Sequence, residues 1–210
     1  MKTPGQVSAK STVHRISVQN GLDGSASGFG DRFWNLLRTH TGVRQALASC
    51  GELQSMTYTD RYLLSPLSIR LLCTTLLAAG APTGVNVLIR TTDGRAAGRE
   101  GVPVSIAHDW RDESTRKAVL GTLLRKAGFT CDVEVGSRSA LPHARVLRLS
   151  CEAGSVDMIL DQGFGYWRSV KSVPFPFTAS IAGQAEALTR TEIIVAGQRS
   201  FPTELFVDKI

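Results

Sequence analysis

Apolar side chains recur at helical spacing in three parts of the chain, and they predict three helices. Asp31 is a suitable N-cap for a helix that continues to about Ala48. A second helix is predicted from Pro66, a residue favoured in the first helical turn, through Ala79. A third is predicted over residues 115–127, where Gly128 supplies the C-terminal stop.

Between these helices lie short apolar runs rich in β-branched residues, which are typical of strands. The predicted strands cover residues 13–18, 52–60, 85–90, 131–135, 145–149 and 156–160, and one more apolar run covers 192–196. The partial alternation over 13–18 favours an edge strand, whereas the continuous run over 85–90 favours a buried central one. The alternating order of strands and helices predicts an α/β fold. We expect residues 1–27 to form a flexible lead-in and residues 28–210 to form a single domain.

The charge of the chain favours polyanionic partners. Lys and Arg total 24 against 18 Asp and Glu, which gives a formal charge of +6. Nucleic acid, acidic lipid and acidic protein surfaces are all compatible with this excess. Many of the cations are arginines, whose guanidinium matches phosphate oxygens in a bidentate way, although a solvated surface explains them equally well.

No apolar run reaches the roughly 18 to 20 residues that a membrane helix needs. The longest one, 71–81, is interrupted by polar residues and glycine and predicts a buried helix. The polar N-terminal segment lacks the apolar core of a signal peptide, so we expect a cytoplasmic protein that does not bind membranes.

The four cysteines, at positions 50, 73, 131 and 151, form no CxxC pair. Zinc ligands usually come in such close pairs, so we expect no metal site. Without an export signal we also expect no disulfide, and the cysteines are interpreted as buried free thiols.

Polar and charged residues gather where predicted strands end, which is where ligands bind in open α/β sheets. Three such segments are Asp60-Arg61-Tyr62, Arg90-Thr91-Thr92 and Asp161-Gln162-Gly163. A fourth segment, 142–148, runs into a predicted strand and contains His143 and Arg145.

A strand would place His143 and Arg145 on one face, because side chains alternate with period two. An imidazole can attack phosphorus or move a proton, while a cation neutralises phosphate oxygens. A structural or surface pair is the alternative interpretation. Asp161 is a candidate carboxylate partner from the neighbouring strand.

The order of these segments resembles the phospholipase D-like C-terminal domain of MIT-domain proteins. The resemblance covers roughly residues 28–170. The matching elements are Phe33-Trp34, Asp60-Arg61-Tyr62, the helix over 67–79, Ile89-Arg90-Thr91-Thr92, His143-Ala144-Arg145 and Leu160-Asp161-Gln162-Gly163-Phe164. The resemblance implies one half of the phospholipase D fold, with a mixed central sheet flanked by helices.

Phospholipase D enzymes use a His-x-Lys strand followed by an Asp, and two such halves form one site. Here Arg145 stands where Lys is expected, and Ser150 stands where the Asp would be. Only one copy of the motif is present, so catalysis would require a homodimer or a partner protein. We therefore expect a degenerate site that binds phosphate without turnover.

The candidate catalytic residues are His143 and Arg145. The expected phosphate-binding residues are Asp60, Arg61, Tyr62, Arg90, Thr91, Thr92, Arg148, Asp161, Gln162 and Gly163. We expect no cofactor.

The expected function is binding of DNA or RNA backbones as a subunit or accessory domain of a larger bacterial complex. One alternative is a homodimeric, metal-independent phosphodiesterase or nuclease. Another is a domain that binds acidic lipid or protein.

Overall fold

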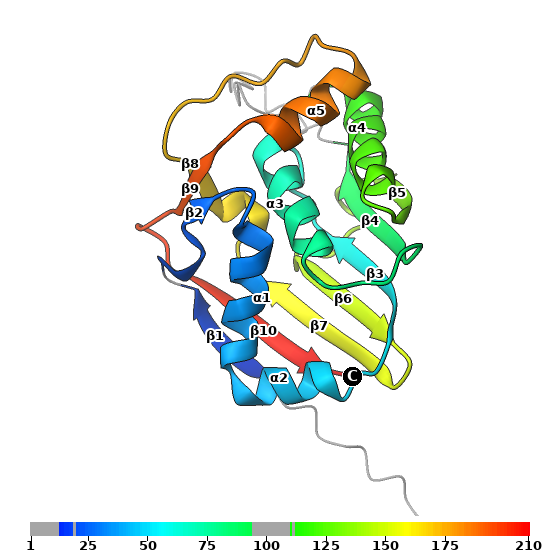
Figure 1. Cartoon of the computed structure of the whole chain (residues 1–210), viewed down its shortest axis with the longest axis vertical. Helices are drawn as coiled ribbons and strands as arrows, with labels where there is room; N and C mark the ends of the chain where they lie inside the picture. The colour runs from blue at the N-terminus through cyan, green and yellow to red at the C-terminus, as the bar shows by residue number, and fades with distance from the viewer. Residues whose placement is uncertain (1–12, 19, 94–109, 111) are drawn as a thin grey trace, which may run out of the picture.

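A seven-stranded mixed β-sheet forms the centre of the molecule (Figure 1). The computed structural model describes residues 13–18, 20–93, 110 and 112–210. The strand order is β1-β10-β7-β6-β3-β4-β5, in which β3, β4 and β5 are parallel and the other neighbours are antiparallel. The strands are β1 (His14–Val18), β3 (Leu53–Thr59), β4 (Asn86–Thr92), β5 (Thr130–Gly136), β6 (Val146–Cys151), β7 (Gly154–Leu160) and β10 (Thr203–Lys209).

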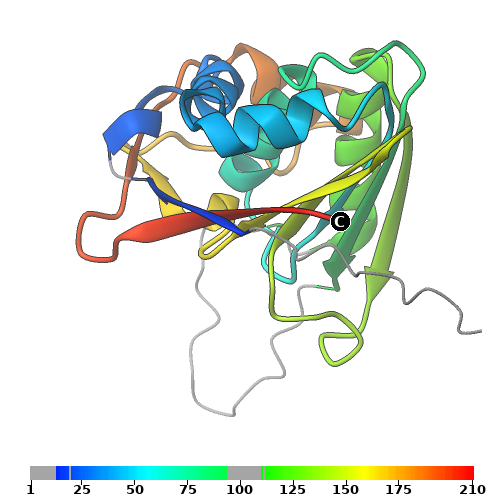
Figure 2. The same ribbon diagram turned by 90° about the horizontal axis from the view of Figure 1, so that it is seen from below.

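Five helices pack on one side of this sheet in the described part of the chain, as the view along the sheet shows (Figure 2). They are α1 (Phe29–Thr39), α2 (Thr41–Ala48), α3 (Pro66–Leu77), α4 (Glu113–Lys126) and α5 (Ile181–Arg190). Burial alternates along the strands accordingly: Met56 and Tyr58 of β3 face the helices and are fully buried, while Thr57 between them is only partly buried. The prediction of an α/β fold with a mixed sheet is confirmed.

A small second sheet, β2 (Gly24–Ser25), β9 (Ile194–Gly197) and β8 (Trp167–Ser169), joins the start of the described chain to its last third. Two 3-10 turns, η1 (Asn20–Leu22) and η2 (Phe164–Tyr166), lead into it. Both β1 and β2 lie within the range 1–27 that was expected to be a lead-in. The edge strand predicted over 13–18 is present as β1.

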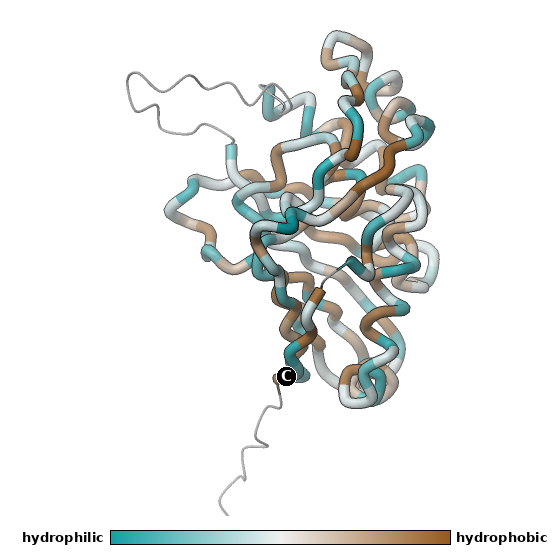
Figure 3. The backbone as a smooth tube through the Cα atoms, turned by 90° about the vertical axis from the view of Figure 1, so that its left-hand side faces the viewer, coloured by the Kyte–Doolittle hydropathy of each residue, from teal (hydrophilic) through white to brown (hydrophobic). Residues whose placement is uncertain are grey.

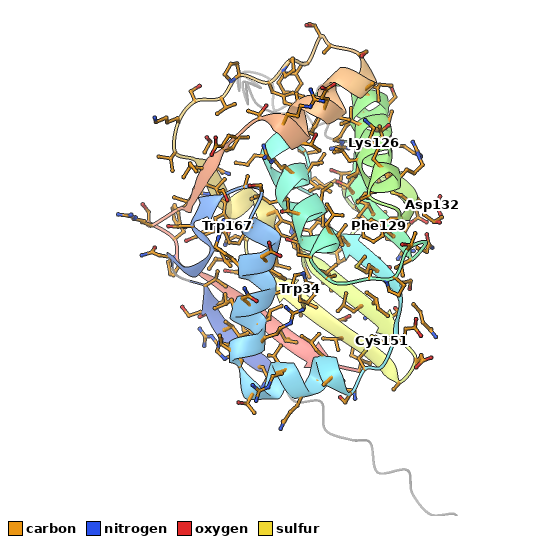
Figure 4. The ribbon with its side chains drawn as sticks, viewed as in Figure 1. Trp34, Lys126, Phe129, Asp132, Cys151 and Trp167 are labelled. Carbon is orange, nitrogen blue, oxygen red and sulfur yellow. A yellow bond between two sulfur atoms is a disulfide. The ribbon has the colours of Figure 1, made fainter. Side chains whose placement is uncertain are left out.

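Aromatic side chains join the helices to the sheet. The ring of Phe29 on α1 lies 4.8 Å from that of Trp167, and the ring of Tyr58 lies 5.3 Å from that of Phe164. The indole of Trp34 donates a 2.8 Å hydrogen bond to the carbonyl of Thr75 on α3, which fixes α1 against α3 (Figure 4). The site described below therefore rests on a rigid base.

Two sequence-based helix and strand boundaries are wrong for identifiable reasons. The helix predicted over 31–48 starts at Phe29 and breaks at His40, whose extended backbone ends α1 and precedes α2. His143 and Arg145 lie in the loop before β6 and not in the strand, so strand alternation is not what brings them together. The helix α5 and the final strand β10 were not predicted.

The interpretation of all four cysteines as free thiols is wrong for two of them. Cys50 follows α2, Cys151 ends β6, and the two form a disulfide with Cα atoms 5.5 Å apart. They are 101 residues apart in sequence, so only the tertiary fold brings them together. Cys73 and Cys131 are free.

Hydrophobic segments are distributed among the strands and the short helices (Figure 3). Within the described residues, no helix is both long and apolar enough to cross a membrane.

The crossing of α1 and α3 yields a first prediction. A Cβ atom at Gly30 would lie 2.0 Å from the carbonyl oxygen of Thr74, a backbone atom that cannot move away on its own. We expect Gly30→Ala to lower the free energy of unfolding by about 2–3 kcal/mol in urea denaturation, because overpacking separates the two helices. Gly136→Ala is the matched control, since a Cβ atom there meets nothing within 4 Å and the change should be nearly neutral. Equal stability of both variants would contradict this close packing.

Candidate phosphate-binding site

Four chain segments meet where the strands of the main sheet end. The parallel strands β3 and β4 both end there, and the antiparallel arrangement brings the start of β6 and the end of β7 to the same place. The segments are Asp60–Tyr62 after β3, Arg90–Thr92 at the end of β4, His143–Arg145 before β6 and Asp161–Gly163 after β7. The sequence-based expectation that these segments converge agrees with this geometry.

The buried carboxylate of Asp60 organises the site. Asp60 is only 1% exposed and accepts hydrogen bonds from the hydroxyl of Tyr58 (2.9 Å) and the backbone N–H of Tyr62 (2.7 Å). The Nε of Arg145 lies 3.7 Å from the Asp60 carboxylate, which is too long for a hydrogen bond but makes an ion pair. A buried carboxylate without such partners would be strongly destabilising.

The pKa of Asp60 is raised, because burial disfavours the charged form more than its partners favour it. The hydrogen bonds from Tyr62 and Tyr58 and the charge of Arg145 all act in the opposite direction. Burial, together with the Asp60 charge, also raises the pKa of Tyr58, so this phenol stays protonated as the donor.

Gly163 closes the turn after β7 directly onto the ion pair. Its φ of 59° and ψ of −169° belong to a region that only glycine adopts readily. A Cβ atom there would lie 2.4 Å from Cδ of Arg145 and 2.8 Å from Oδ2 of Asp60. This glycine is therefore required by the close approach of the turn, and it holds Arg145 against Asp60.

The ring of Tyr62 contacts two arginines. The guanidinium carbons of Arg145 and Arg138 lie 4.8 Å and 5.3 Å from its ring centroid, which are cation–π distances. Arg138 also donates a 3.1 Å hydrogen bond to the Tyr62 hydroxyl. Arg138 was not among the predicted site residues, because it lies in a polar loop with no strand or motif to single it out.

Arg61 lies beside His143. Its Nε donates a 2.6 Å hydrogen bond to the carbonyl of Leu141, and its Nη1 lies 3.0 Å from Nε2 of His143. A guanidinium can only donate, so His143 Nε2 is the acceptor in this hydrogen bond. The hydroxyl of Thr92 donates to the backbone carbonyl of Arg61 at 2.8 Å and fixes this loop to β4.

The site is therefore a cluster of cations with little negative charge. Three arginines, Arg61, Arg138 and Arg145, stand beside an exposed histidine, and Asp60 beneath them is the buried counter-charge. Asp161 and Gln162 are exposed at the rim, and the backbone carbonyl of Asp161 accepts a hydrogen bond from Arg145. Such a group of donors suits an anion with several acceptor oxygens, as phosphate has.

Three predicted residues lie outside this cluster. Arg90 and Arg148 lie on the sheet face opposite the helices, where Arg90 pairs with Glu134 at 2.9 Å and Arg148 makes two 2.6 Å hydrogen bonds to Asp157. Thr91 is buried, and its hydroxyl has no hydrogen-bond partner among the described residues.

The surroundings of His143 differ from those that the resemblance to phospholipase D enzymes leads us to expect. Ser150, where that resemblance predicts an Asp, pairs with Ser155 near the opposite end of β6. The described part of the chain shows no carboxylate hydrogen-bonded to His143, and no group of three or more metal-binding side chains. The arrangement of N–H donors is suited to holding an anion.

The Asp60–Arg145 pair yields a second prediction. Arg145→Met should lower the free energy of unfolding at pH 7 by about 2–3 kcal/mol, because it leaves a buried carboxylate without its cation. The folded-state pKa of Asp60 is already raised above its unfolded value, and the loss of Arg145 raises it further. The cost of burying the carboxylate therefore disappears as the pH falls through that folded-state pKa.

Urea denaturation at pH 7 and at about pH 4.5 gives the free energy of unfolding of wild type and Arg145→Met. The difference between the two proteins should be smaller at the lower pH. The double variant Asp60→Asn/Arg145→Met serves as the control, because it has no carboxylate to protonate. A difference that does not depend on pH would refute the assignment of the pair.

Comparison with known proteins gives one family. The model of the family described as "DEAD/DEAH box helicase YjiV, C-terminal domain" matches residues 12–209. No curated protein matches the chain.

Among solved structures, a polyphosphate kinase from Porphyromonas gingivalis aligns with 94% of this chain and 23% of its own length, at 9% identity and a TM-score of 0.37. That similarity is too low to support an inference about function. The family match covers nearly the whole chain, which therefore belongs to the family of YjiV helicase C-terminal domains.

Proposed function

We propose that this domain binds the phosphate backbone of DNA or RNA through the cation cluster at the ends of β3, β4 and β7. The observation that carries the proposal is the convergence of Arg61, Arg138, Arg145 and His143 at these strand ends, where Asp60 beneath them is the buried counter-charge among the described residues. Membership of a family named for a helicase gives the nucleic acid as the anion to test first.

In this proposal the three arginines have different tasks. Arg145 is held by Asp60, by the carbonyl of Asp161 and by the ring of Tyr62, so its position is fixed in advance. Arg61 and Arg138 each use part of their guanidinium for internal contacts and retain further N–H groups for phosphate oxygens. Fixed cations bind phosphate with a smaller loss of side-chain entropy than mobile ones.

We further propose that the domain acts as an accessory nucleic-acid contact of a larger cytoplasmic complex, and that it does not cleave its ligand. We still expect this domain to be related to one half of the phospholipase D fold. In that relationship His143 retains the histidine position, and Ser150 replaces the carboxylate partner. The hydrogen bond from Arg61 to His143 supports binding over nucleophilic attack, because it uses the Nε2 lone pair.

Binding is tested with the double variant Arg61→Gln/Arg138→Gln. Its affinity for a fluorescent 20-nucleotide single strand and for the matching duplex should fall about tenfold or more at low salt. The slope of log K against log salt should also decrease by about 1–2 units, because fewer phosphates are neutralised. Fluorescence anisotropy measures both quantities.

The matched control is Arg38→Gln/Arg44→Gln, which removes two exposed arginines of α1 and α2 and should leave both the affinity and the salt slope unchanged. Circular dichroism establishes that all variants are folded. Equal losses in the control and in the site variant would show that net charge, and not this cluster, accounts for binding.

The absence of cleavage is tested with His143→Gln, which retains an acceptor for Arg61. Wild type and variant should both leave labelled DNA intact in the presence and absence of EDTA, and their affinities should agree within about twofold. Cleavage by the wild type that the variant loses would instead support a phosphodiesterase.

A further inference from the structure

The outer edge of β5 is an open strand edge beside a groove. β5 is the last strand of the main sheet and pairs only with β4 among the described strands. The backbone N–H of Thr130 donates to Val85 across this pair, so Thr130, Asp132 and Glu134 direct their backbone groups toward β4. The alternate residues Cys131, Val133 and Val135 therefore direct theirs outward, where an additional strand could pair with them.

A cleft of about 710 Å³ lies between this edge and α4. Its helix side is a stripe of residues one turn apart, and its strand side is formed by β5 and the adjacent part of β4. The lining residues used below are Lys117, Ala118, Gly121, Arg125, Cys131 and Asp132. Ala118 and Gly121 are small, and the group that lies over Gly121 is the flexible guanidinium of Arg125, which can move aside for the backbone of another chain.

The charges of the cleft differ on its two sides. Lys117 and Arg125 on α4 are exposed and make no ion pair with another described residue. On the other side of β5 lie Asp132, exposed at the outer edge of the molecule (Figure 4), and Glu134, whose side chain is 59% exposed while it pairs with Arg90. Side chains of an added strand alternate between these two sides.

We propose that β5 binds an extended peptide segment by strand addition, and that this segment carries acidic side chains toward α4 and basic ones toward Asp132 and Glu134. Backbone hydrogen bonds to Cys131 and Val133 provide affinity, and the alternating charges provide register and specificity. The segment belongs to a partner protein, and the charges on the two sides of β5 set its chemistry. This surface is separate from the cation cluster.

The probe is a fluorescent nine-residue peptide in which glutamate and lysine alternate between terminal valines. We expect saturable binding to the wild-type protein. A second peptide has the same composition, but its glutamates and lysines are arranged in two blocks, and it should bind at least about fivefold more weakly because one face then carries both signs. A third is N-methylated at alternate backbone nitrogens and should not bind, because the donors needed for the strand ladder are missing.

Three protein variants identify the location. Lys117→Glu/Arg125→Glu should weaken binding about tenfold or more, whereas Lys126→Glu on the same helix but outside the cleft should not. Cys131→Pro removes an outward N–H and should weaken binding, whereas Cys131→Val keeps that N–H and should not. Gly121→Leu fills the cleft, and a Cβ atom there meets only the flexible guanidinium of Arg125 at 3.2 Å, so this variant should fold and fail to bind.

Absence of binding by the wild type would overturn the proposal. Binding that survives both Cys131→Pro and peptide N-methylation would also overturn the proposal, because such binding would be electrostatic and would not need backbone hydrogen bonds to β5. Thermal unfolding of each variant separates loss of binding from loss of fold. DNA affinity should be unchanged in Gly121→Leu, so the outcome is independent of the proposed nucleic-acid site.

Discussion

The ion pair of the buried Asp60 with Arg145 is the interaction on which the candidate site depends. It joins the segment after β3 to the segment before β6, while Gly163 brings the turn after β7 down onto both side chains. Its free energy is a balance, because burial raises the pKa of Asp60 while Tyr58, Tyr62 and Arg145 favour the charged form. The pair positions Arg145 and, through the Tyr62 ring, Arg138.

The proposed function separates binding from catalysis in this domain. Phosphate recognition needs fixed donors, and in this proposal the three arginines provide them. Nucleophilic catalysis by His143 would need a free lone pair and an orienting carboxylate, whereas Nε2 accepts from Arg61 and Ser150 lies elsewhere on β6. β5 connects the two surfaces discussed here, since its outer edge lines the cleft beside α4 and Arg138 follows two residues after its end.

The convergence of these segments could be predicted from the sequence, because strand ends are visible in the hydrophobic pattern and polar residues follow them. Asp60, Arg61, Tyr62, His143 and Arg145 were singled out in this way, and their binding of phosphate stays a prediction. The reasoning about His143 and Arg145 was nevertheless wrong in its mechanism, since both lie in a loop and are aligned by contacts with Arg61 and Asp60. Arg90 and Arg148 were included for their charge, and only the sheet register shows that each faces an acidic neighbour. The disulfide of Cys50 with Cys151 likewise depends on distant segments that no local pattern connects.

The most direct test of the account is a map of where nucleic acid touches the domain. Uniformly ¹⁵N-labelled protein is titrated with an oligothymidine single strand while backbone and arginine side-chain resonances are followed by NMR. The account predicts the largest shifts at Arg61, Tyr62, Arg138, His143 and Arg145, with little change along α2. Shifts concentrated on another surface, with these resonances unmoved, would contradict the assignment of this cation cluster as the phosphate-binding site.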